Sequence, residues 1–512
     1  GPIGGAFAHF IWGEGEELEW GCSFLAGSAG RGRVALLAGL EAFGKSALHF
    51  HMAALTCGTC DGMCDCFGSV ASAMAMVRME INAPTTASNT INVLPEVTKH
   101  RGIMVENRRY LHQHPELSYQ EVDTAKYLQV QIDNIIQEYN TTHATSLPVT
   151  MVQQVDGTHG MWVDVSFGTS STNYNASPTI LLRADMDALP IQETGTLSYK
   201  SQNKGCMHAC GHDAHMAILV AALRVLVLEE DATLCGKIRF MFQPAEEGGA
   251  GALRMIKGGC LDGVDRVFGL HIWNFMDAHT VGIAPGPITA FSDRIYIDIV
   301  GAGGHGSMPQ GTVDAVLVAA HLVVALHSGV VSRSVDPFEA VALTVGKIVG
   351  GEVANAIAGT ARLEGTVRTR NKDTKKIVVQ RIEEICRGVG VMFGATVSLN
   401  YKDGYPATIS SEEGAKDVAA AATRVVGKAN VVAPHPTLAG EDMSYYLEKR
   451  DGAFFFVGSA KKGCSIVPHH RADFDIDEQC LDVGASVMVQ LVLDLCGGGG
   501  GGGGGQVGLS PK

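Results

Sequence analysis

The strongest constraint on the fold is the alternation of short apolar strands with long apolar helices after residue 96. Between residues 149 and 272 the strand candidates are VTMVQQV, GMWVDVSF, TILLRADM, KIRFMFQP and RVFGLHI, and the apolar helix candidate AHMAILVAALRVLVLEE lies between the third and the fourth. Strands that alternate with helices are typical of a mostly parallel sheet covered by helices. We therefore predict an α/β fold with a mixed, mostly parallel sheet.

A second pattern interrupts this alternation between residues 291 and 405. There the predicted elements follow the β-α-β-β-α-β order of a ferredoxin-like unit. The chain then returns to the first pattern through the helix SEEGAKDVAAAATRVVG, the strand AFFFVG and a final helix. We predict one domain built from residues 96–290 and 406–496, with residues 291–405 inserted into it as a second domain.

The two ends of the chain differ from the rest in composition. Residues 1–95 are rich in Gly, Ala, Cys and Met without a sustained apolar period, so we predict an extension without its own fold; a translation start at Met52 or Met79 is the alternative interpretation. The C-x2-C-x3-C-x-C run at 57–66 offers zinc ligands. In structural zinc sites a loop normally separates the two pairs of cysteines, whereas here the second pair follows the first almost directly. Residues 497–512 begin with a glycine tract and are predicted to be a flexible tail.

Charge and hydropathy argue against several classes of partner. Asp and Glu outnumber Lys and Arg by 53 to 39, and the net charge of -14 argues against nucleic acid and against an anionic membrane surface. No uncharged apolar run of roughly eighteen residues occurs, so we expect no membrane span. Most cysteines stand singly in apolar runs, which favours a cytoplasmic location, although sequons at Asn140 and Asn175 would permit secretion. A small-molecule substrate is the remaining expectation.

Ligands for a borderline-soft metal are concentrated in the segment GCMHACGHDAH, residues 205–215. Cys210 and His212 stand in the ACGHD turn directly before the long apolar helix, with Asp213 as the expected N-cap. The helix N-terminus would stabilise a thiolate at Cys210. A single residue of this kind is usually a buried Cys or a surface His, but a run of Cys and His within one short segment favours a metal site.

A pair of adjacent carboxylates, Glu246 and Glu247, follows the strand candidate KIRFMFQP and precedes the glycine-rich GGAGA. That position is the carboxyl end of a strand, where α/β sheets hold ligands. Because consecutive side chains point in different directions, one carboxylate can bind metal while the other transfers protons. The alternative is an ordinary solvated acidic turn. Together with the Cys and His segment, the pair predicts a metal-dependent hydrolase.

Two further histidine groups are candidates to complete a ligand set. His271 ends the strand candidate RVFGLHIW, where a histidine is more often a hydrogen-bonded core residue than a metal ligand. The pair His469 and His470 in PHHRADFDIDE lies about 200 residues later. Spacing along the sequence does not decide whether the fold brings these residues together.

Taken together, these segments resemble the M20 peptidase family, in particular its amidohydrolase branch of indole-acetyl-amino-acid hydrolases, hippurate hydrolases and N-acetyl-diaminopimelate deacetylases. The resemblance covers roughly residues 97–495 and follows the order of the family's motifs. These motifs are HQHPELSYQE, RADMDALPIQE, GCMHACGHDAH, FQPAEEGGAGA, GLHIW, GGHGSMP, AGEDMSYY and HHRADFDIDE.

The resemblance implies a metal-dependent amidohydrolase that cleaves the amide bond of N-acyl amino acids or related conjugates. It implies two divalent ions, which we expect to be zinc or manganese, with cobalt as a further candidate. Glu246 is then the general base, and Asp187 in RADMDALP orients the ligands. The implied metal ligands are Cys210 as the bridge, His212, Glu247, His271 and His470.

The resemblance also implies roles for the inserted domain. We expect a homodimer formed through residues 291–405, in which His305 of GGHGSMP reaches the active site of the partner subunit and polarises the scissile carbonyl. Asn355 matches a position that helps to bind the substrate in many members of the family.

Some features depart from the family pattern. Gln310 stands where many relatives have a second histidine, and residues 471–473 replace the H-x-P spacing before Phe474. The choice of His470 over His469 therefore rests on its four-residue distance to Phe474. The first 95 residues have no counterpart in the family.

Two other functions stay open at this point. One is a catalytically silent relative that holds metal and binds conjugates. The other is a hydrolase that uses Cys210 as its nucleophile and His212 as the base.

Overall fold

The computed structural model describes residues 91–143, 146–168, 178–229 and 234–497, together with the backbone of three N-terminal strands. The chain divides into two compact units, Gly1–Ala87 and Ser88–Lys512. In the first unit β1 (Ala6–Trp12), β2 (Glu16–Ala29) and β3 (Arg33–Gly39) form an antiparallel sheet in that order. The cysteine run at 57–66 and residues 498–512 lie outside the described residues, so what we predict for them stays a prediction.

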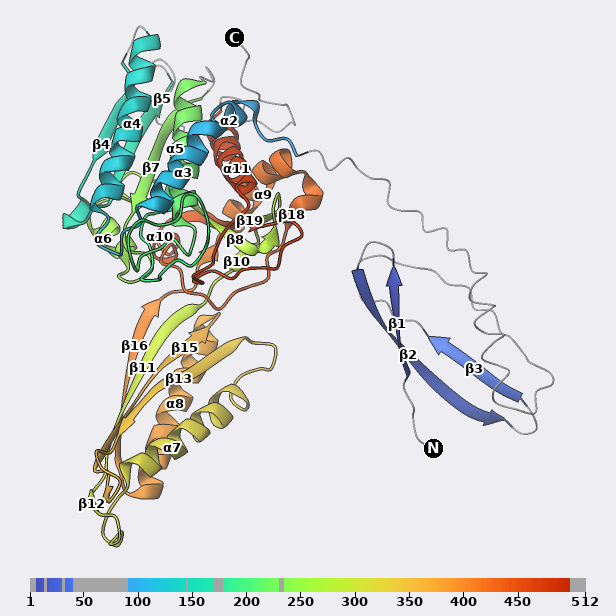
Figure 1. The fold of residues 1–512 in the computed structure, drawn as a ribbon, viewed down its shortest axis with the longest axis vertical. Coiled ribbons are helices and arrows are strands. Elements are labelled where there is room, and N and C mark those ends of the chain that lie inside the picture. The colour runs from blue at the N-terminus through green and yellow to red at the C-terminus, as the bar shows by residue number, and fades with distance from the viewer. Residues whose placement is uncertain are drawn as a thin grey trace. The chain divides into compact units, whose positions relative to one another are not determined.

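The second unit is built on an eight-stranded mixed sheet (Figure 1). Its strand order is β18-β9-β19-β8-β6-β7-β5-β4, and the four strands β19, β8, β6 and β7 run parallel. Antiparallel pairing joins β5 to β4 and β7, and β19 to β9. The predicted α/β class with a mixed sheet is confirmed. The strands are β4 (Val149–Val152), β5 (Met161–Phe167), β6 (Thr179–Asp185), β7 (Gly236–Gln243), β8 (Arg266–Asp277), β9 (Val281–Gly282), β18 (Val431–Val432) and β19 (Asp451–Ala460).

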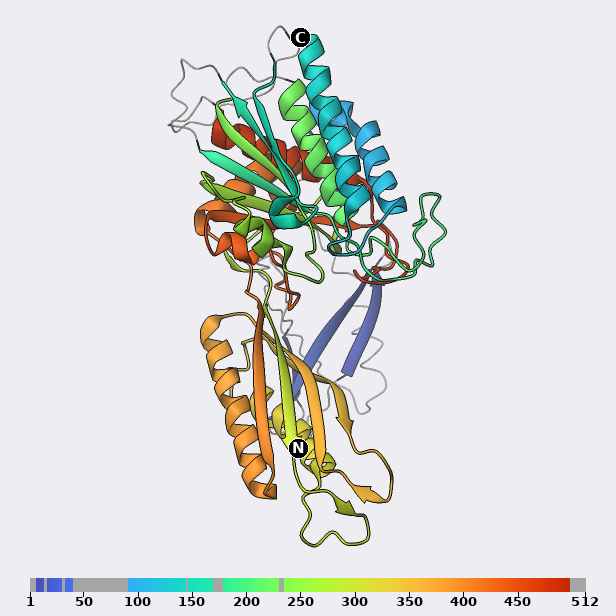
Figure 2. The same ribbon diagram turned by 90° about the vertical axis from the view of Figure 1, so that its left-hand side faces the viewer.

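Helices cover this sheet on both faces, because its central strands are apolar on both sides. On one face α3, α4 and α5 lie side by side (Figure 2), and α9 and α11 complete the layer. Ile180 and Leu182 of β6 pack against this layer, whereas Leu181 packs with residues of α6 and α10 on the other face. The helices are α2 (Pro95–Lys99), α3 (Arg101–Gln113), α4 (Val122–Thr142), α5 (His212–Leu228), α6 (Gly251–Lys257), α9 (Glu412–Val426), α10 (Ser444–Leu447) and α11 (Gln479–Cys496).

The C-terminal helix α11 is apolar around most of its circumference. Among the described helices it alone is long and apolar enough to cross a membrane, but 83% of its apolar window is buried inside the fold. It packs against α5 and α9. The apolar composition of α11 is therefore explained by its place in the core.

Residues 291–405 form a second sheet, of four antiparallel strands in the order β13-β15-β11-β16, with a core of its own. Along the chain its elements follow the β-α-β-β-α-β order, and α7 and α8 pack on one face. Two short strands, β12 (Gly304–His305) and β14 (Ala356–Ile357), pair at the end away from the eight-stranded sheet (Figure 1). The main elements are β11 (Phe291–Val300), α7 (Ala315–Leu326), β13 (Val341–Gly350), β15 (Thr360–Thr369), α8 (Lys372–Phe393) and β16 (Thr396–Tyr405).

The chain enters and leaves this insert at adjacent points. The strand β10 (Gly286–Pro287) precedes β11, the strand β17 (Ile409–Ser410) follows β16, and the two pair with each other. Beside them the hydroxyl of Thr289 donates a hydrogen bond of 2.8 Å to that of Thr408. The insert is thus joined to the rest of the unit by two paired segments.

A glycine at the start of β19 permits the close approach of β8. Gly452 has a φ of +153°, and a Cβ built on it would lie 1.7 Å from the main-chain oxygen of Val267. We predict that Gly452→Ala lowers the free energy of unfolding by about 3 kcal/mol, measured by chemical denaturation, because the strands must separate to admit the methyl group. Gly388→Ala in the middle of α8 is the matched control, since apart from the nearby backbone of its own helix nothing lies within 4 Å of its Cβ. Equal losses in both variants would contradict this packing argument.

Candidate metal centre

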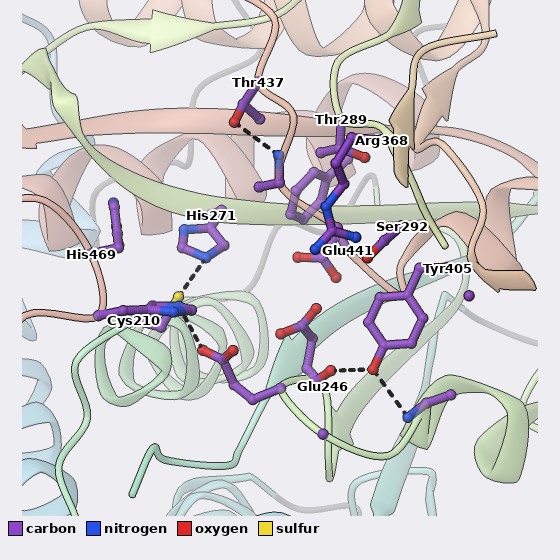
Figure 3. Close-up of a pocket in the computed structure, with 18 of the residues that line it drawn as sticks. Cys210, Glu246, His271, Thr289, Ser292, Arg368, Tyr405, Thr437, Glu441 and His469 are labelled. Atoms are coloured by element: carbon purple, nitrogen blue, oxygen red, sulfur yellow. Dashed lines mark hydrogen bonds and ion pairs between the residues drawn. The ribbon is translucent and has the colours of Figure 1, made fainter. Parts of the chain in front are cut away.

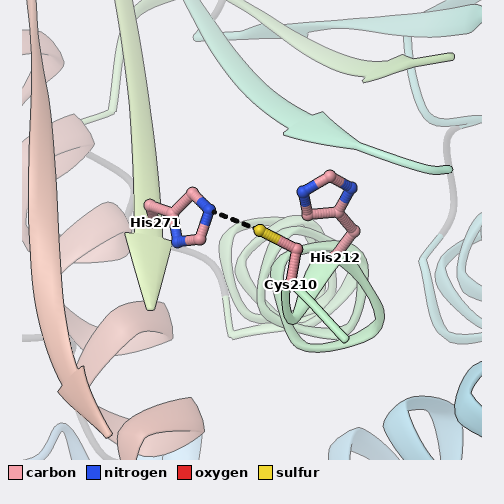
Figure 4. Close-up of side chains that lie close together, drawn as sticks. All are labelled: Cys210, His212 and His271. Atoms are coloured by element: carbon pink, nitrogen blue, oxygen red, sulfur yellow. Dashed lines mark hydrogen bonds between the residues drawn. The ribbon is translucent and has the colours of Figure 1, made fainter. Parts of the chain in front are cut away.

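The site begins at the turn that precedes α5. Gly211 has a φ of 93°, and a Cβ on it would lie 2.3 Å from Cδ1 of Ile272, so the turn can approach β8 only with glycine at this position. Asp213, the expected N-cap, lies inside the first turn instead, where it bonds Arg108 and His112 at 2.9 Å each. This turn places the sulfur of Cys210 between the imidazoles of His212 and His271 (Figure 4).

His212 is fully buried, and its two ring nitrogens have different surroundings. Nδ1 donates a hydrogen bond of 2.8 Å to the main-chain oxygen of Asp187, whereas Nε2 has no hydrogen-bond partner in the described structure. Burial alone would lower the pKa of His212, but the carboxylates of Asp185 and Asp187 outweigh it and raise that pKa to about 10. The surroundings of His212 therefore favour a positive charge.

His271 presents Nε2 to the site because its other nitrogen is engaged. Nδ1 donates to the main-chain oxygen of Ile272 at 2.6 Å, and Nε2 lies 3.3 Å from the sulfur of Cys210. The main-chain N–H of Ile272 donates to Nε2 of His215 at 2.9 Å, and Nδ1 of His215 donates to Asp185 at 2.6 Å. Burial, with His215 nearby, holds the pKa of His271 well below its usual range. A neutral imidazole with a free lone pair is the form that binds metal.

The two glutamates of the loop after β7 are oriented by Asp187. Its carboxylate accepts hydrogen bonds from the main-chain N–H groups of Glu246 at 2.9 Å and Glu247 at 3.0 Å, and from the hydroxyl of Ser118 at 2.6 Å. Burial, together with the nearby carboxylates of Glu441 and Glu247, raises the pKa of Glu246 well above its ordinary value. Glu246 is thus a buried carboxyl group beside the cluster of candidate ligands.

The structure distinguishes between the two C-terminal histidines. His470 donates its main-chain N–H to the oxygen of Ala209 at 2.8 Å, and its Nε2 lies 3.1 Å from Glu247 Oε1. His469 stacks on Trp273, and its Nε2 accepts a hydrogen bond of 3.2 Å from the main chain of Asn274. The geometry therefore supports His470 as the candidate ligand.

The donor atoms of these residues lie close enough to share metal ions. Those of Cys210, His212 and His271 lie within 4.8 Å of one another, and so do those of Cys210, Glu247 and His470. Cys210 belongs to both groups, which is the position of a bridging ligand. His212 Nε2 is buried without a hydrogen-bond partner in the described structure and lies 4.0 Å from Glu247 Oε1, so a cation between these two atoms would satisfy the imidazole. The residues present therefore fit a pair of divalent ions.

The charge state of Cys210 points in the same direction. Burial, with the carboxylates of Glu247 and Glu246 nearby, raises the pKa of its thiol well above the usual range. The expected effect of the helix N-terminus is outweighed. A thiolate at Cys210 therefore requires a bound cation.

Arg183, for which the sequence predicts no role, is fully buried on β6. Its guanidinium nitrogens lie 2.6 Å from Asp185, 2.8 Å from Asp442 and 3.2 Å from Glu441. Asp442 also accepts a hydrogen bond of 3.0 Å from the main-chain N–H of Ala252, just after the glutamate loop. The motifs RADMDALP and AGEDMSYY contain these partners. Arg183 and Asp442 are 259 positions apart, so no local sequence pattern indicates that they pair.

A cavity of about 750 Å³ lies against the cluster, between it and the insert sheet (Figure 3). This volume suits a small-molecule ligand. The hydroxyl of Tyr405 on β16 donates to the main-chain oxygen of Glu246 at 2.5 Å and accepts from the N–H of Ala250 at 3.1 Å. The insert therefore contacts the glutamate loop directly. Five candidate site residues line the cavity, namely Cys210, Glu246, Glu247, His271 and His470.

His305 and Asn355 do not line this cavity within one chain. His305 lies on β12, and the main-chain N–H of Gly306 donates to the oxygen of Asn355 at 2.8 Å. Both residues are exposed. Their strands lie at the end of the insert away from the eight-stranded sheet (Figure 1). The fold thus brings His305 and Asn355 together, but apart from the other candidates.

Known proteins share both the sequence and the architecture of this chain. Residues 181–494 match the profile of Peptidase family M20/M25/M40. The chain is 39% identical over 375 residues to a Bacillus subtilis protein named N-acetyl-L-cysteine deacetylase, which covers 73% of this chain and 83% of that protein. It is 34% identical over 389 residues to an Arabidopsis thaliana protein named IAA-amino acid hydrolase ILR1-like 4, and this match covers 75% of this chain and 83% of that protein.

A solved structure shows the same likeness. The crystal structure of a Bacillus subtilis protein described as a dinuclear metal binding peptidase from the M20 family superposes with a TM-score of 0.66 at 28% identity. The superposition covers 78% of this chain and 99% of that chain.

We predict that Asp187→Asn weakens zinc binding by about 10- to 100-fold, because the amide replaces one of the two oxygens that accept from the glutamate loop. Equilibrium dialysis against graded zinc concentrations measures the effect. Asp123→Asn is the matched control, since Asp123 is exposed on α4 and pairs with Lys126. Equal zinc affinity in the two variants would mean that Asp187 does not position the ligands.

Proposed function

Because this chain belongs to peptidase family M20/M25/M40, we propose that the cluster around Cys210 is the active site of a two-metal hydrolase. The enzyme is a metal-dependent amidohydrolase that hydrolyses the amide bond of N-acyl amino acids or related conjugates. One observation carries the proposal: donor groups from four separate chain segments converge beside one cavity. The proposed ligands are Cys210, His212, Glu247, His271 and His470.

Glu246 is the proposed general base. The two ions, when held by these ligands, would lower the pKa of a bound water and would stabilise negative charge on the carbonyl oxygen of the amide. A carboxylate oxygen of Glu246 accepts the proton of the attacking water and then donates it to the nitrogen of the leaving amine. Asp187 and Tyr405 hold the main chain of the loop, so that Glu246 keeps its place beside the cavity.

Zinc is the first candidate for the metal. A bridging thiolate suits zinc, whereas the imidazole and carboxylate ligands also accept manganese and cobalt. A cytoplasmic location is proposed because most cysteines stand singly in apolar runs.

A mechanism with Cys210 as nucleophile and His212 as base is disfavoured by the charge states of the two groups. The carboxylates of Asp185 and Asp187 outweigh burial and raise the pKa of His212 to about 10, so its imidazole is positively charged and cannot accept a proton. Burial raises the pKa of the Cys210 thiol well above its usual range, so the thiol stays protonated. An activated cysteine needs the opposite shift.

The insert is proposed to be a ferredoxin-like dimerisation domain. Its strand β13 is an edge strand that exposes Ile348 and Val349, and the neighbouring helix α7 exposes Leu317 and Val324. An exposed apolar edge strand is a template for pairing with a second chain. In such a homodimer the end of one insert carries His305 to the cavity of the partner subunit, where it polarises the scissile carbonyl while Asn355 binds the substrate.

We predict that Glu246→Gln lowers kcat by on the order of 1000-fold, because the amide cannot accept a proton. The assay uses N-acetyl, N-benzoyl and indole-acetyl amino acids with zinc- or manganese-loaded enzyme. Metal content measured on the same samples separates loss of the base from loss of the site. Glu412→Gln, at an exposed position of α9, serves as the control. Wild-type turnover by Glu246→Gln would exclude Glu246 as the base, and absence of any turnover by the metal-loaded wild type would exclude the proposed function.

We predict that two inactive variants restore activity when their subunits are mixed. If each site combines Glu246 of one chain with His305 of the other, unfolding and refolding Glu246→Gln with His305→Ala in equal amounts gives about one quarter of wild-type activity. Each variant refolded alone stays inactive and provides the control. A mixture that stays inactive, with mixed dimers demonstrated by mass spectrometry, would show that His305 does not act across the interface.

A further inference from the structure

One wall of the cavity is cationic. It is formed by Arg294 on β11, Arg368 on β15 and Lys402 on β16, which lie on the face of the insert sheet opposite α7 and α8. The strand register places Arg294 directly opposite Lys402, and Arg368 directly opposite Ser292, two residues closer to the start of β11. Like charges directly opposite each other destabilise a sheet, so this arrangement needs a compensating partner.

Within the described part of the chain, none of these three cations forms an ion pair with a carboxylate. Other cations on the same sheet face are paired: Arg362 lies 2.9 Å from Asp298, and Lys347 lies 3.2 Å from Glu364. The cations that line the cavity therefore lack carboxylate partners, whereas these two cations outside the cavity have them.

The acidic residues around this wall already have other partners. Asp403 lies 2.7 Å from Lys375, and Glu441 lies 3.2 Å from Arg183. Asp293, on the opposite face of the strand, also pairs with Lys375, at 2.9 Å. An anionic ligand bound in the cavity would supply the compensating negative charge.

We propose that the amino acid half of the substrate carries two carboxylates, as in N-acyl aspartate or N-acyl glutamate; this inference rests on the proposed function. Every N-acyl amino acid brings one carboxylate, and one arginine can bind it through two parallel hydrogen bonds. Three unpaired cations exceed that need. After the α-carboxylate is bound two of these positive charges remain, and a second carboxylate on the substrate side chain offsets one of them.

The register also assigns the two carboxylates. Arg368 is partly buried, whereas Arg294 and Lys402 are exposed. Arg368 is closer to the point where the chain enters the insert, and the opposed pair lies about 7 Å farther along the strands. Arg368 therefore binds the α-carboxylate that all substrates share. Arg294 and Lys402 bind the side-chain carboxylate.

The test compares N-acyl glutamate with N-acyl glutamine, which has the same shape without the second charge, using acetyl, benzoyl and indole-acetyl versions of each. We expect wild-type kcat/KM to be at least about tenfold higher for the glutamate substrate, and to fall more steeply with added salt. Arg294→Gln and Lys402→Met should each reduce kcat/KM for glutamate by on the order of tenfold and leave glutamine within about twofold. Arg368→Gln should reduce both.

Lys416→Met is the matched control, because it removes an exposed cation on α9 that pairs with Glu412 outside the cavity. It should leave both substrates unchanged. Equal kcat/KM for the two substrates in the wild type, or parallel losses in Arg294→Gln and Lys402→Met, would overturn the dicarboxylate assignment while leaving the proposed function intact. Absence of turnover for every N-acyl amino acid would overturn the proposed function and this inference with it.

Discussion

The arrangement of the site depends on one buried cation, Arg183. A guanidinium removed from water without partners costs several kcal/mol, so the segments that carry its carboxylates must assemble around it. Asp185 bonds both Arg183 and His215, and His215 in turn holds the main chain of β8 beside His271. Asp442 bonds Arg183 and the N–H of Ala252 at the end of the glutamate loop. Through this one guanidinium, two of the segments that supply ligands are held in place relative to β6.

The insert adds to the site by direct contact. Tyr405 bonds the main chain of the glutamate loop on both sides, at Glu246 and Ala250. The same sheet carries the cationic wall of the cavity. Any movement of the insert therefore changes the loop that holds the base and the surface that holds the substrate at the same time. The strand β16 carries both Lys402, which lines the cavity, and Tyr405, which bonds the loop of the base, and so couples substrate binding to the orientation of the base.

Sequence patterns predicted those parts of the structure that depend on local order. The apolar periods located β6, β7, β8 and α5. The candidate ligands were found through the family motifs, but His271, predicted to end its strand, lies in the middle of β8. The two-residue strands β10 and β17 carry no period and were missed. Asp213 was assigned as an N-cap from its position, but Arg108 and His112 engage its carboxylate. Contacts between distant segments, such as Arg183 with Asp442, leave no local pattern.

The paired strands β10 and β17 bring the two crossings of the chain to one place on the surface of the larger sheet. A segment whose ends lie side by side can be added to or removed from a fold without changing the connectivity of its host. The strands before the insert and those after it belong to the same eight-stranded sheet. Because every proposed metal ligand lies outside the inserted unit, the cavity wall can be changed by replacing that unit while the ligand set stays the same.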